Sequence, residues 1–378
     1  MSWQRPVEWP LPQEFEGFWA VTRHRDIVQI SKDSETFRSG DSVVFEPIPP
    51  DIARVSAFFL AMDAPEHTRL RKLIAAAFSP RHIAKISESI QRNAREIVEE
   101  FATMPDPDIV QDLSRKLPER TFFDMIGVPM DDRERVGNLV NVVTGHAVRD
   151  ANEDPIERLL RFNRDLREYG AELAARRRVE PADDVMTSLA AAELDGQRLS
   201  DDEMGAAMVL LAVAGNDTTR QTTSHAVKAL SDNPDQLAWL REDLDGRLQG
   251  AVEEFIRWAT PIIQFARVAS RDCQVGEQMI RRGEKVVMVY SSGNRDESVF
   301  ADPYTFDLTR TPNLHVGFGG GGIHYCLGAP VARAQLRALF RELLHKVPRL
   351  EVGEPTYAST TLVNAVAAMP AHNPDASH

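Results

Sequence analysis

The sequence lacks the features that mark membrane, secreted and nucleic-acid-binding proteins. No apolar run approaches the ~18–20 residues that a membrane-spanning helix needs. The opening residues, MSWQRPVEWP, contain no basic stretch followed by an apolar one, so they do not read as a signal peptide. With 44 basic and 57 acidic residues the net charge is 44 − 57 = −13, which argues against general nucleic-acid binding. We therefore expect a cytoplasmic globular protein.

Cysteine is also scarce, with only Cys273 and Cys326 in 378 residues. A cytoplasmic protein of this size has little need of a disulfide. Cys273 lies in the ordinary segment SRDCQVGEQ and is predicted to be inert, whereas Cys326 lies in the most unusual segment of the chain. No repeat, low-complexity tract or Gly/Ser-rich linker divides the sequence, so residues 1–378 are predicted to form one domain.

Most of the chain beyond Pro65 has the hydrophobic periodicity of amphipathic helices, for example over 83–102 and 155–178. The short runs GFWAVT, IIQFARVA and KVVMVY predict strands. A last strand is predicted within TLVNAVAAM, and the tail AHNPDASH is expected to fray. The predicted fold class is therefore mainly α with a minor β portion.

The helix predicted over 200–231 is the most informative element. Ser200 and Glu203 form a capping box at its start, and Asn233-Pro234 ends it. At ~1.5 Å per residue its length is about 48 Å, long enough to cross a domain. Its apolar middle, MVLLAVAG, turns abruptly into the polar run NDTT.

This abrupt turn breaks several local rules at once. Gly215 in a helix interior costs about 1 kcal/mol relative to alanine. The acid and the two threonines of residues 217–219 need partners if they are buried, and a threonine can bond back to a carbonyl and distort the helix. Such a turn in a central helix indicates function. The alternative is a solvated stripe on a surface helix.

The segment HVGFGGGGIHYCLGAPVARAQLRALF, residues 315–340, surrounds Cys326. Its four successive glycines allow close approach to a flat object and positive φ angles. Cys326 stands where the loop becomes a helix predicted over 327–347, with Pro330 in the first turn. Amide donors and the helix dipole at this position favour the thiolate, which is the form that binds metal.

Three other readings of the loop stay open at this point. Gly317, Gly319 and Gly322 match the dinucleotide pattern G-x-G-x-x-G, although the preceding TRTPNL is a poor strand. A phosphate-binding loop would need Lys and Ser/Thr after the glycines, and these are missing. A zinc site built on His324 and Cys326 lacks two further ligands at the usual spacing. The loop favours a metal or haem thiolate.

Taken together, the segments resemble the cytochrome P450 family. FGGGGIHYCLG is similar to its haem-binding signature, AGNDTT to its oxygen-activation motif, and FADPYTFD to the meander before the Cys loop. Glu254 and Arg257 match the Glu-x-x-Arg of its K helix, and His67 and Arg71 match a His-x-x-x-Arg pair that binds haem propionate. The blocks occur in the family's order over 65–344.

Two features depart from the family's pattern. The phenylalanine that usually stands seven residues before the cysteine is replaced by Gly319, and Phe318 lies one position earlier. The chain also opens at what corresponds to the first strand region. We therefore expect the family's preceding helical segment to be missing.

The resemblance implies a cytochrome P450 fold with haem b, iron protoporphyrin IX, between the long central helix and the helix after Cys326. Cys326 would be the axial thiolate. Buried propionates need charged partners, and the resemblance supplies His67, Arg71, Arg267 and His324. Further haem contacts would come from Ala214, Gly215, Phe318, Gly319 and Gly328. From the residues alone, a surface cation is the favoured reading of Arg71, and a loop filler is the favoured reading of His324.

By the same resemblance Asp217 and Thr218 would deliver protons for oxygen activation, with Gly215 leaving room for O2. Proton delivery requires a hydroxyl and an acid within reach of each other and of water. The alternative for Thr218 is a helix-distorting role only. Glu254 and Arg257 could be a surface ion pair worth a few tenths of a kcal/mol, but their apolar neighbours and the family favour a buried, structural pair.

Electrons must come from a partner, because the chain shows no flavin or iron–sulfur segment. Arg333, Arg337 and Arg341 share one helix face and suit an acidic ferredoxin or flavodoxin, although an ordinary solvated face is equally consistent.

Several predicted pocket positions are apolar and indicate a hydrophobic substrate: Met208, Leu211, Ala212, Ala214, Ile262, Ile263, Phe265, Leu362 and Val363. The resemblance favours hydroxylation of a sterol, terpenoid or branched lipid, with macrolide tailoring as the alternative. A peroxide-driven enzyme and a non-catalytic haem sensor also remain open.

Overall fold

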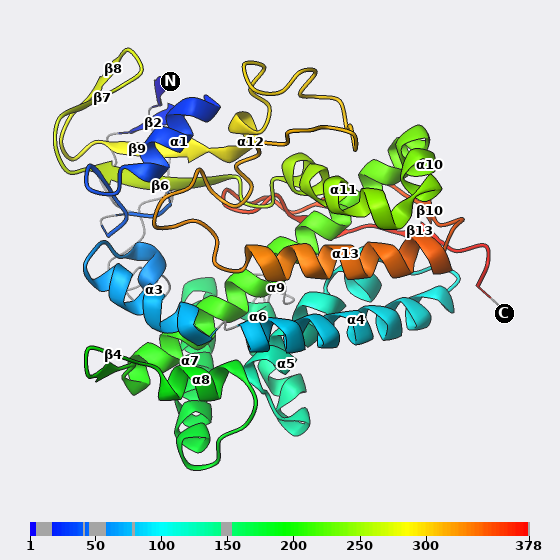
Figure 1. Ribbon diagram of the computed structural model, residues 1–378, viewed down its shortest axis with the longest axis horizontal. Coiled ribbons are helices and arrows are strands. Elements are labelled where there is room, and N and C mark those ends of the chain that lie inside the picture. Colours follow the sequence, from blue (N-terminus) through cyan, green and yellow to red (C-terminus); the bar gives the residue numbers. More distant parts are fainter. Residues whose placement is uncertain (5–16, 41, 45–57, 78–79, 145–152, 377–378) are drawn as a thin grey trace.

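The computed structural model describes residues 1–4, 17–40, 42–44, 58–77, 80–144 and 153–376. Helices make up most of the molecule, and the larger strands gather at one side of it (Figure 1). This arrangement confirms the predicted mainly α fold with a minor β portion.

The described helices follow the predicted periodicity closely. The long ones, in chain order, are α1 (His24–Lys32), α3 (Glu66–Ala77), α4 (Pro80–Ala102), α5 (Lys116–Ile126), α6 (Arg133–Val143), α7 (Pro155–Val179), α9 (Asp201–Asp232), α10 (Pro234–Glu242), α11 (Leu244–Ala259) and α13 (Ala329–Lys346). Shorter ones are α8 (Val185–Ala191), α12 (Tyr290–Gly293) and a π-helix, η2 (Ile109–Ser114). No helix of the described residues is long and apolar enough to span a membrane.

A mixed sheet of five strands forms the β portion, in the order β1-β2-β9-β6-β3. Its strands are β1 (Ser2–Gln4), β2 (Phe18–Val21), β3 (Phe37–Arg38), β6 (Gln264–Ala269) and β9 (Lys285–Val289). Within this sheet β2 and β9 run parallel, and the other pairs are antiparallel. Helix α1 packs on the sheet through Ile27 and Ile30, which join a small apolar core with Val21, Val286 and Met288.

The remaining strands form two-stranded pairs. They are β4 (Glu193–Leu194) with β5 (Gln197–Arg198), β7 (Cys273–Val275) with β8 (Gln278–Ile280), β10 (Glu351–Val352) with β13 (Ala371–His372), and β11 (Thr356–Tyr357) with β12 (Val366–Ala368). The strand predicted within TLVNAVAAM is thus shorter than the apolar run that signals it.

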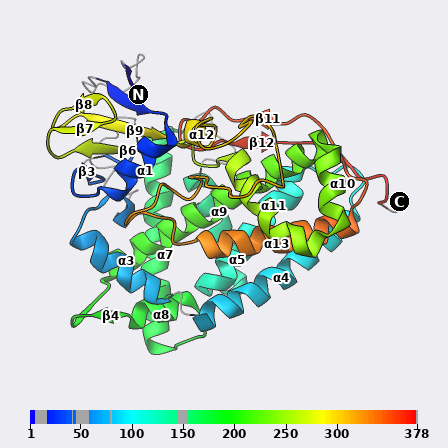
Figure 2. The same cartoon turned by 45° about the horizontal axis from the view of Figure 1, so that its top comes forward.

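Helix α9 crosses the middle of the molecule, and α13 lies alongside α4 in both views (Figure 1, Figure 2). The predicted capping box is confirmed, with Ser200 and Glu203 each bonding the other's backbone N–H. Two glycines allow α9 to pack tightly on α7. A Cβ on Gly205 would lie 2.5 Å from the Arg167 carbonyl oxygen, and one on Gly170 would lie 2.5 Å from the Met208 Cβ.

The prediction that the tail frays is wrong for residues 371–373. Ala371 and His372 form β13, and the backbone N–H of Asn373 donates to the Pro105 carbonyl at 2.8 Å. The Asn373 side chain donates to the Ala102 carbonyl at 2.9 Å. These long-range bonds fix the tail to the end of α4, and no local pattern announces them.

Candidate active site

The glycine loop before Cys326 runs against α1, and this contact explains two of its glycines. A Cβ on Gly322, which has φ +76°, would lie 2.1 Å from the Ser31 carbonyl oxygen. One on Gly320 would lie 2.6 Å from the Ser31 Oγ. Gly319 differs, because no atom lies within 4 Å of its Cβ position. Its φ of +96° disfavours any larger residue, which accounts for glycine where the family usually has phenylalanine.

Cys326 lies at the end of this loop, just before α13 begins. Its backbone N–H donates to the Phe318 carbonyl at 3.1 Å. Its Sγ accepts hydrogen bonds from the backbone N–H groups of Gly328 and Ala329. Solvent reaches the residue, yet protein atoms surround the sulfur closely enough that burial dominates its pKa.

Burial raises the pKa of the Cys326 thiol, while the two amides, Arg71 and Arg333 act in the opposite direction without cancelling it. The predicted preference for thiolate therefore does not hold from the protein's own groups alone. A coordinated metal ion removes the thiol proton outright, so the donor set suits metal ligation.

A group of cations and imidazoles lies near Cys326, contributed by three separate elements: His67 and Arg71 of α3, Arg267 of β6, and His324 of the loop. The rings of His67 and His324 are 4.2 Å apart. Neither ring nitrogen of the fully buried His67 has a hydrogen-bond partner among the described residues, and neither does Nδ1 of His324. His324 Nε2 pairs with the Ser39 hydroxyl at 3.0 Å.

The pKa values of this group reflect burial first and, for the two histidines, neighbouring positive charge. Burial, followed by Arg71, lowers the pKa of His67. Burial, followed by Arg267 and His67, lowers the pKa of His324 to about 2. Burial also lowers the pKa of Arg71 and of Arg267.

No carboxylate of the described residues forms an ion pair with either guanidinium of the group. Arg71 donates to the Tyr325 carbonyl and Arg267 to the adjacent Ala266 carbonyl. The nearest acid, Asp63, accepts the backbone N–H groups of Ser39 and Gly40 at 2.8 and 3.0 Å. Buried polar groups need partners, so the cluster fits a cofactor that carries its own carboxylates, as haem does.

The polar turn of α9 is buried on one side and accessible on the other. Asp217 is 7% exposed, whereas Ala214 is exposed in the middle of the same helix. No atom lies within 4 Å of a Cβ built on Gly215. The Thr218 hydroxyl donates to the Ala214 carbonyl at 3.0 Å. The turn therefore presents a small-residue surface with a hydroxyl beside it, and the surface-stripe alternative is wrong.

Glu254 and Arg257 form the buried pair that the family implies. Arg257 donates two hydrogen bonds of 2.7 Å to the Glu254 carboxylate, and both residues are fully buried. Arg257 also donates to the carbonyls of Asn294, Pro303 and Thr305. The pair therefore fixes the meander to α11, and the surface-pair alternative is wrong.

The arginine stripe of α13 is not a row of free cations. Arg333 donates to both carboxylate oxygens of Glu253 at 2.7 and 2.8 Å and lies 4.5 Å over the Phe318 ring. Burial alone raises the pKa of Glu253, but hydrogen bonds from Arg333 and His315 lower it to about 2. Arg341 pairs with Asp245, and of the three only Arg337 has no ion pair among the described residues.

The structure brings together some of the apolar residues predicted for the pocket and separates others. The Ile263 N–H donates to the Leu362 carbonyl at 2.8 Å, and Ile262 pairs with Val363 in an isolated bridge. Met208 and Ala212 are instead fully buried in the helical core, where Met208 faces α7. Leu211 and Ala214 of α9 remain accessible.

Sequence reasoning missed three contributors to the site. Ser39 bonds His324 across 285 positions of chain, Asp63 holds the backbone beside it, and Gln221 donates to Asp217. Ser39 and Asp63 stand in no motif. Gln221 lies one turn after Asp217, and its i, i+4 spacing is the one signal that could have indicated the contact.

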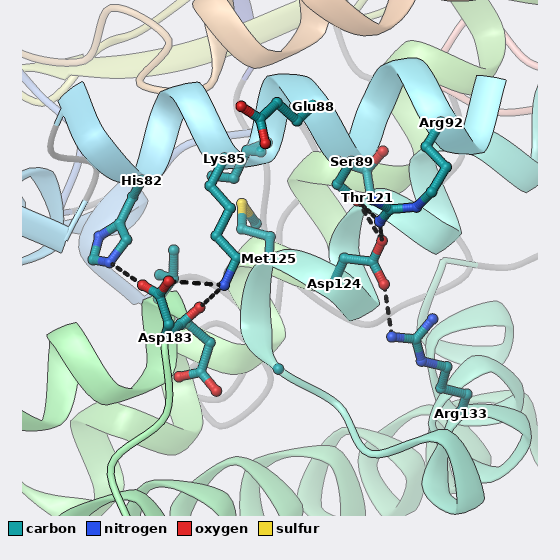
Figure 3. A pocket seen from close by; sticks show the side chains of 14 residues that line it. His82, Lys85, Glu88, Ser89, Arg92, Thr121, Asp124, Met125, Arg133 and Asp183 are labelled. Carbon is teal, nitrogen blue, oxygen red and sulfur yellow. Dashed lines mark hydrogen bonds and ion pairs between the residues drawn. The ribbon is translucent and has the colours of Figure 1, made fainter. Parts of the chain in front are cut away.

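A separate cavity of about 320 Å³ opens between α4, α5 and the start of α8 (Figure 3). Its charged side chains pair with one another: Lys85 lies 3.1 Å from Asp183, and Arg133 lies 2.6 Å from Asp124. It shares no residue with the cluster around Cys326. The charges of these two pairs are therefore neutralised within the wall of the cavity.

Comparison with known proteins agrees with this geometry. The sequence profile described as Cytochrome P450 matches residues 20–348. A steroid C26-monooxygenase of Mycolicibacterium smegmatis is 38% identical over 358 residues, 93% of this chain and 82% of the relative. The chain belongs to the cytochrome P450 family. A methyl-branched lipid omega-hydroxylase of Mycobacterium tuberculosis is 37% identical over 374 residues, 98% of this chain and 87% of the relative.

Among solved structures, a Mycobacterium marinum cytochrome P450 in complex with pseudoionone is 49% identical. It superposes with a TM-score of 0.93 over 98% of this chain and 91% of that one. The protein is therefore a cytochrome P450 monooxygenase with the haem-thiolate cofactor of its family. The interpretations of the loop as a dinucleotide or zinc site, and of the protein as a non-catalytic haem sensor, are therefore wrong. Among the described residues no three His, Cys, Asp or Glu side chains are grouped as they would be in a metal site built from protein ligands alone.

Proposed function

We propose that this cytochrome P450 hydroxylates a sterol, a terpenoid or a branched lipid. The balanced reaction consumes the substrate C–H bond, O2, two electrons and two protons, and yields the alcohol and water. Two similar relatives bear the names steroid C26-monooxygenase and methyl-branched lipid omega-hydroxylase, at 38% and 37% identity. The accessible apolar residues beside the polar turn of α9 and at Ile262, Ile263, Leu362 and Val363 suit such a substrate.

The single observation that carries the cofactor assignment is the cluster of His67, Arg71, Arg267 and His324, in which no guanidinium forms an ion pair with a carboxylate of the described residues. In this proposal haem b lies between α9 and α13, with Cys326 as its metal ligand. His67, Arg71, Arg267 and His324 bind the propionates. The remaining contacts come from Ala214, Gly215, Phe318, Gly319 and Gly328. When bound, the haem supplies oxygen activation, and its thiolate ligand favours O–O cleavage.

Asp217 and Thr218 are the proposed proton-delivering residues. The Thr218 hydroxyl donates to the Ala214 carbonyl at 3.0 Å, so it must rotate away from this bond before it can donate elsewhere. Asp217 is buried next to it and can return a proton to the hydroxyl or to an adjacent water. An acid beside a threonine disfavours a peroxide-driven reaction, which needs no proton relay of this kind.

The proposed electron donor is a ferredoxin or flavodoxin. Arg337 supports this choice, because it is the cation of the α13 stripe that has no ion pair among the described residues. Arg333 cannot serve in the same way, because Glu253 and Phe318 hold its guanidinium. We further infer that residues 1–378 form one haem-thiolate monooxygenase domain.

Turnover with a panel of substrates tests the proposed function. The purified holoprotein receives NADH, a ferredoxin and a ferredoxin reductase, together with cholest-4-en-3-one, a methyl-branched fatty acid or a macrolide. We expect hydroxylated product from the steroid or the branched acid. Product from the macrolide alone would replace this substrate class with the alternative one.

A further inference from the structure

Gln221 connects the proposed proton-delivering acid to a strand far away in the sequence. It is fully buried in α9, one turn after Asp217. Its Nε2 donates to the Asp217 Oδ1 at 3.0 Å, and its Oε1 accepts the backbone N–H of Val366 in β12 at 2.8 Å. Both ends of the amide are therefore engaged.

These two bonds fix the orientation of the amide. A backbone N–H can only donate, so the Gln221 oxygen must face Val366 and the NH2 group must face Asp217. The backbone N–H in β12 thus determines which way the Gln221 amide faces, and the Asp217 carboxylate accepts a charge-assisted hydrogen bond from its NH2 group. This bond offsets part of the desolvation penalty of a carboxylate that is 7% exposed.

The strand does not depend on Gln221 for its own position. His225, one turn further along α9, pairs with the Asn364 carbonyl at 3.0 Å. Asn364 in turn donates from its side chain to the Ala259 carbonyl at 2.8 Å, at the end of α11. The backbone N–H of Asn364 also donates to the Pro261 carbonyl at 3.0 Å. The segment before β12 is thus held by three contacts at Asn364 besides the one at Val366, so its position does not depend on the Gln221 amide.

We propose that Gln221 is a positioning residue, which holds the Asp217 carboxylate in its proton-delivering orientation with β12 as the fixed point. The inference rests on the proposed role of Asp217. It assigns Gln221 no contact with substrate or cofactor. It also separates Gln221 from His225 of the same helix, which contacts Asn364 just before β12, whereas Gln221 bonds Asp217.

Three variants test the assignment. Gln221→Met removes both hydrogen bonds at similar volume. Gln221→Glu keeps an acceptor for the Val366 N–H but turns the donor facing Asp217 into a second carboxylate. The matched control, His225→Phe, removes the other strand contact and keeps a ring in place. Thermal unfolding of each holoprotein shows whether the variants fold.

The first readout is the amount of product formed per NADH consumed. We expect Gln221→Met and Gln221→Glu to lower it about tenfold, the effect of losing one hydrogen bond to a charged group. His225→Phe is expected to stay within about twofold, because His225 does not bond Asp217 and the Asn364 segment keeps its contacts with Ala259 and Pro261. Equal losses in Gln221→Met and His225→Phe would overturn the proposal, because Gln221 would then be only a strand anchor.

The pH dependence of Gln221→Glu gives a signature that a structural role would not produce. Two adjacent carboxylates share a proton when the pH falls, and the introduced carboxyl group, once protonated, would again donate to Asp217. Arg220 lies beside this pair on α9, and Arg115, Glu119 and Asp108 surround Arg220. The product formed per NADH should therefore recover at lower pH in Gln221→Glu and not in Gln221→Met. A yield that does not change with pH in either variant would contradict the assignment.

The last readout needs no turnover. Infrared spectra of the resting protein with 13C-labelled aspartate give the Asp217 carboxylate band by subtraction of an Asp217→Asn variant. We expect Gln221→Met to shift this band and His225→Phe to leave it unchanged. An unmoved band in Gln221→Met overturns the proposal. If the wild type makes no product from any substrate, the proposed function fails, and the infrared comparison still decides the role of Gln221.

Discussion

Two buried clusters of charged and titratable residues in this protein differ in how far their polar groups are paired. At the end of α11, Arg257 is paired with Glu254 and also bonds the carbonyls of Asn294, Pro303 and Thr305. Near Cys326, the ring nitrogens of His67 have no partner among the described residues, and Arg267 bonds only a carbonyl next to it in sequence. The charges of the first cluster are paired, whereas the guanidinium groups of the second form no ion pair with a carboxylate of the described residues.

The largest expected effect comes from breaking the first cluster. Arg257→Ala removes the bidentate partner of the buried Glu254 carboxylate and, among the described residues, leaves it only the longer contact with Arg310 at 3.5 Å as an ion pair. We expect the free energy of unfolding to fall by about 3–5 kcal/mol. Urea denaturation measures this change. The control, Arg341→Ala, removes an exposed pair with Asp245 and should change stability by less than about 1 kcal/mol. Similar values for the two variants would remove the distinction.

The second cluster should respond in the opposite sense. Removing a positive charge by Arg267→Met relieves crowding, so we expect the haem-free protein to be as stable as the wild type or more stable. The same change should weaken haem binding by about tenfold or more, because a hydrogen bond to a charged group is worth about 1.5–3 kcal/mol. Haem titration and urea denaturation of the haem-free protein measure the two effects. A large loss of stability without haem would show that Arg267 is structural.

The two regions should also differ in how pH affects their stability. The pKa of His67 is lowered in the fold from 6.5, so below this value the unfolded chain binds a proton that the folded one does not. The stability of the haem-free protein should therefore fall as pH drops below 6.5, by at most about 1.4 kcal/mol per pH unit for this group. Denaturation between pH 5 and 8 with a His67→Phe comparison isolates the contribution, and an unchanged slope in the variant would contradict it.

Glu253, beside Arg333, sets a second pH window. Its pKa is lowered to about 2 from 4.5, so the stability it contributes is present above pH 4.5 and disappears as pH falls towards 2. Glu253→Gln should remove this part of the acid sensitivity and leave the behaviour around pH 6.5 unchanged. Acid titration of both proteins followed by circular dichroism checks this expectation; parallel curves over the whole range would count against it.

The smallest expected effect concerns the arginine stripe. Arg337→Glu should raise the ferredoxin concentration needed for half-maximal turnover a few-fold at low salt, because exposed charges steer association. The effect should disappear at high salt, where the charges are screened. Arg341→Glu, at the position already paired with Asp245, is the matched control and should change this concentration less. Equal effects of the two variants would mean that the Arg341–Asp245 ion pair has no influence on ferredoxin docking.

The sequence predicts the elements of this protein better than their contacts. The capping box at Ser200 indicated the start of α9, and the change from MVLLAVAG to NDTT located its half-buried polar turn. The same periodicity placed Arg333, Arg337 and Arg341 on one face. It could not show that Glu253, 80 positions earlier, neutralises the first of them.

The glycine run shows the same limit. Successive glycines indicate close approach and positive φ. Close approach occurs at Gly320 and Gly322, and positive φ at Gly319, Gly321 and Gly322. The surface that Gly320 and Gly322 approach is α1, nearly 300 positions away in the sequence. Contacts between distant segments depend on the whole packing arrangement, so the Ser39–His324 bond and the anchored tail could not be predicted either.

The ligation of haem by Cys326 is tested most directly by a carbon monoxide difference spectrum. The dithionite-reduced holoprotein and a Cys326→Ser variant are compared under the same conditions. We predict a strongly red-shifted Soret band in the wild type that the variant loses. A protein that takes up no haem, or a histidine-like band that is indifferent to the Cys326 substitution, would contradict the assignment.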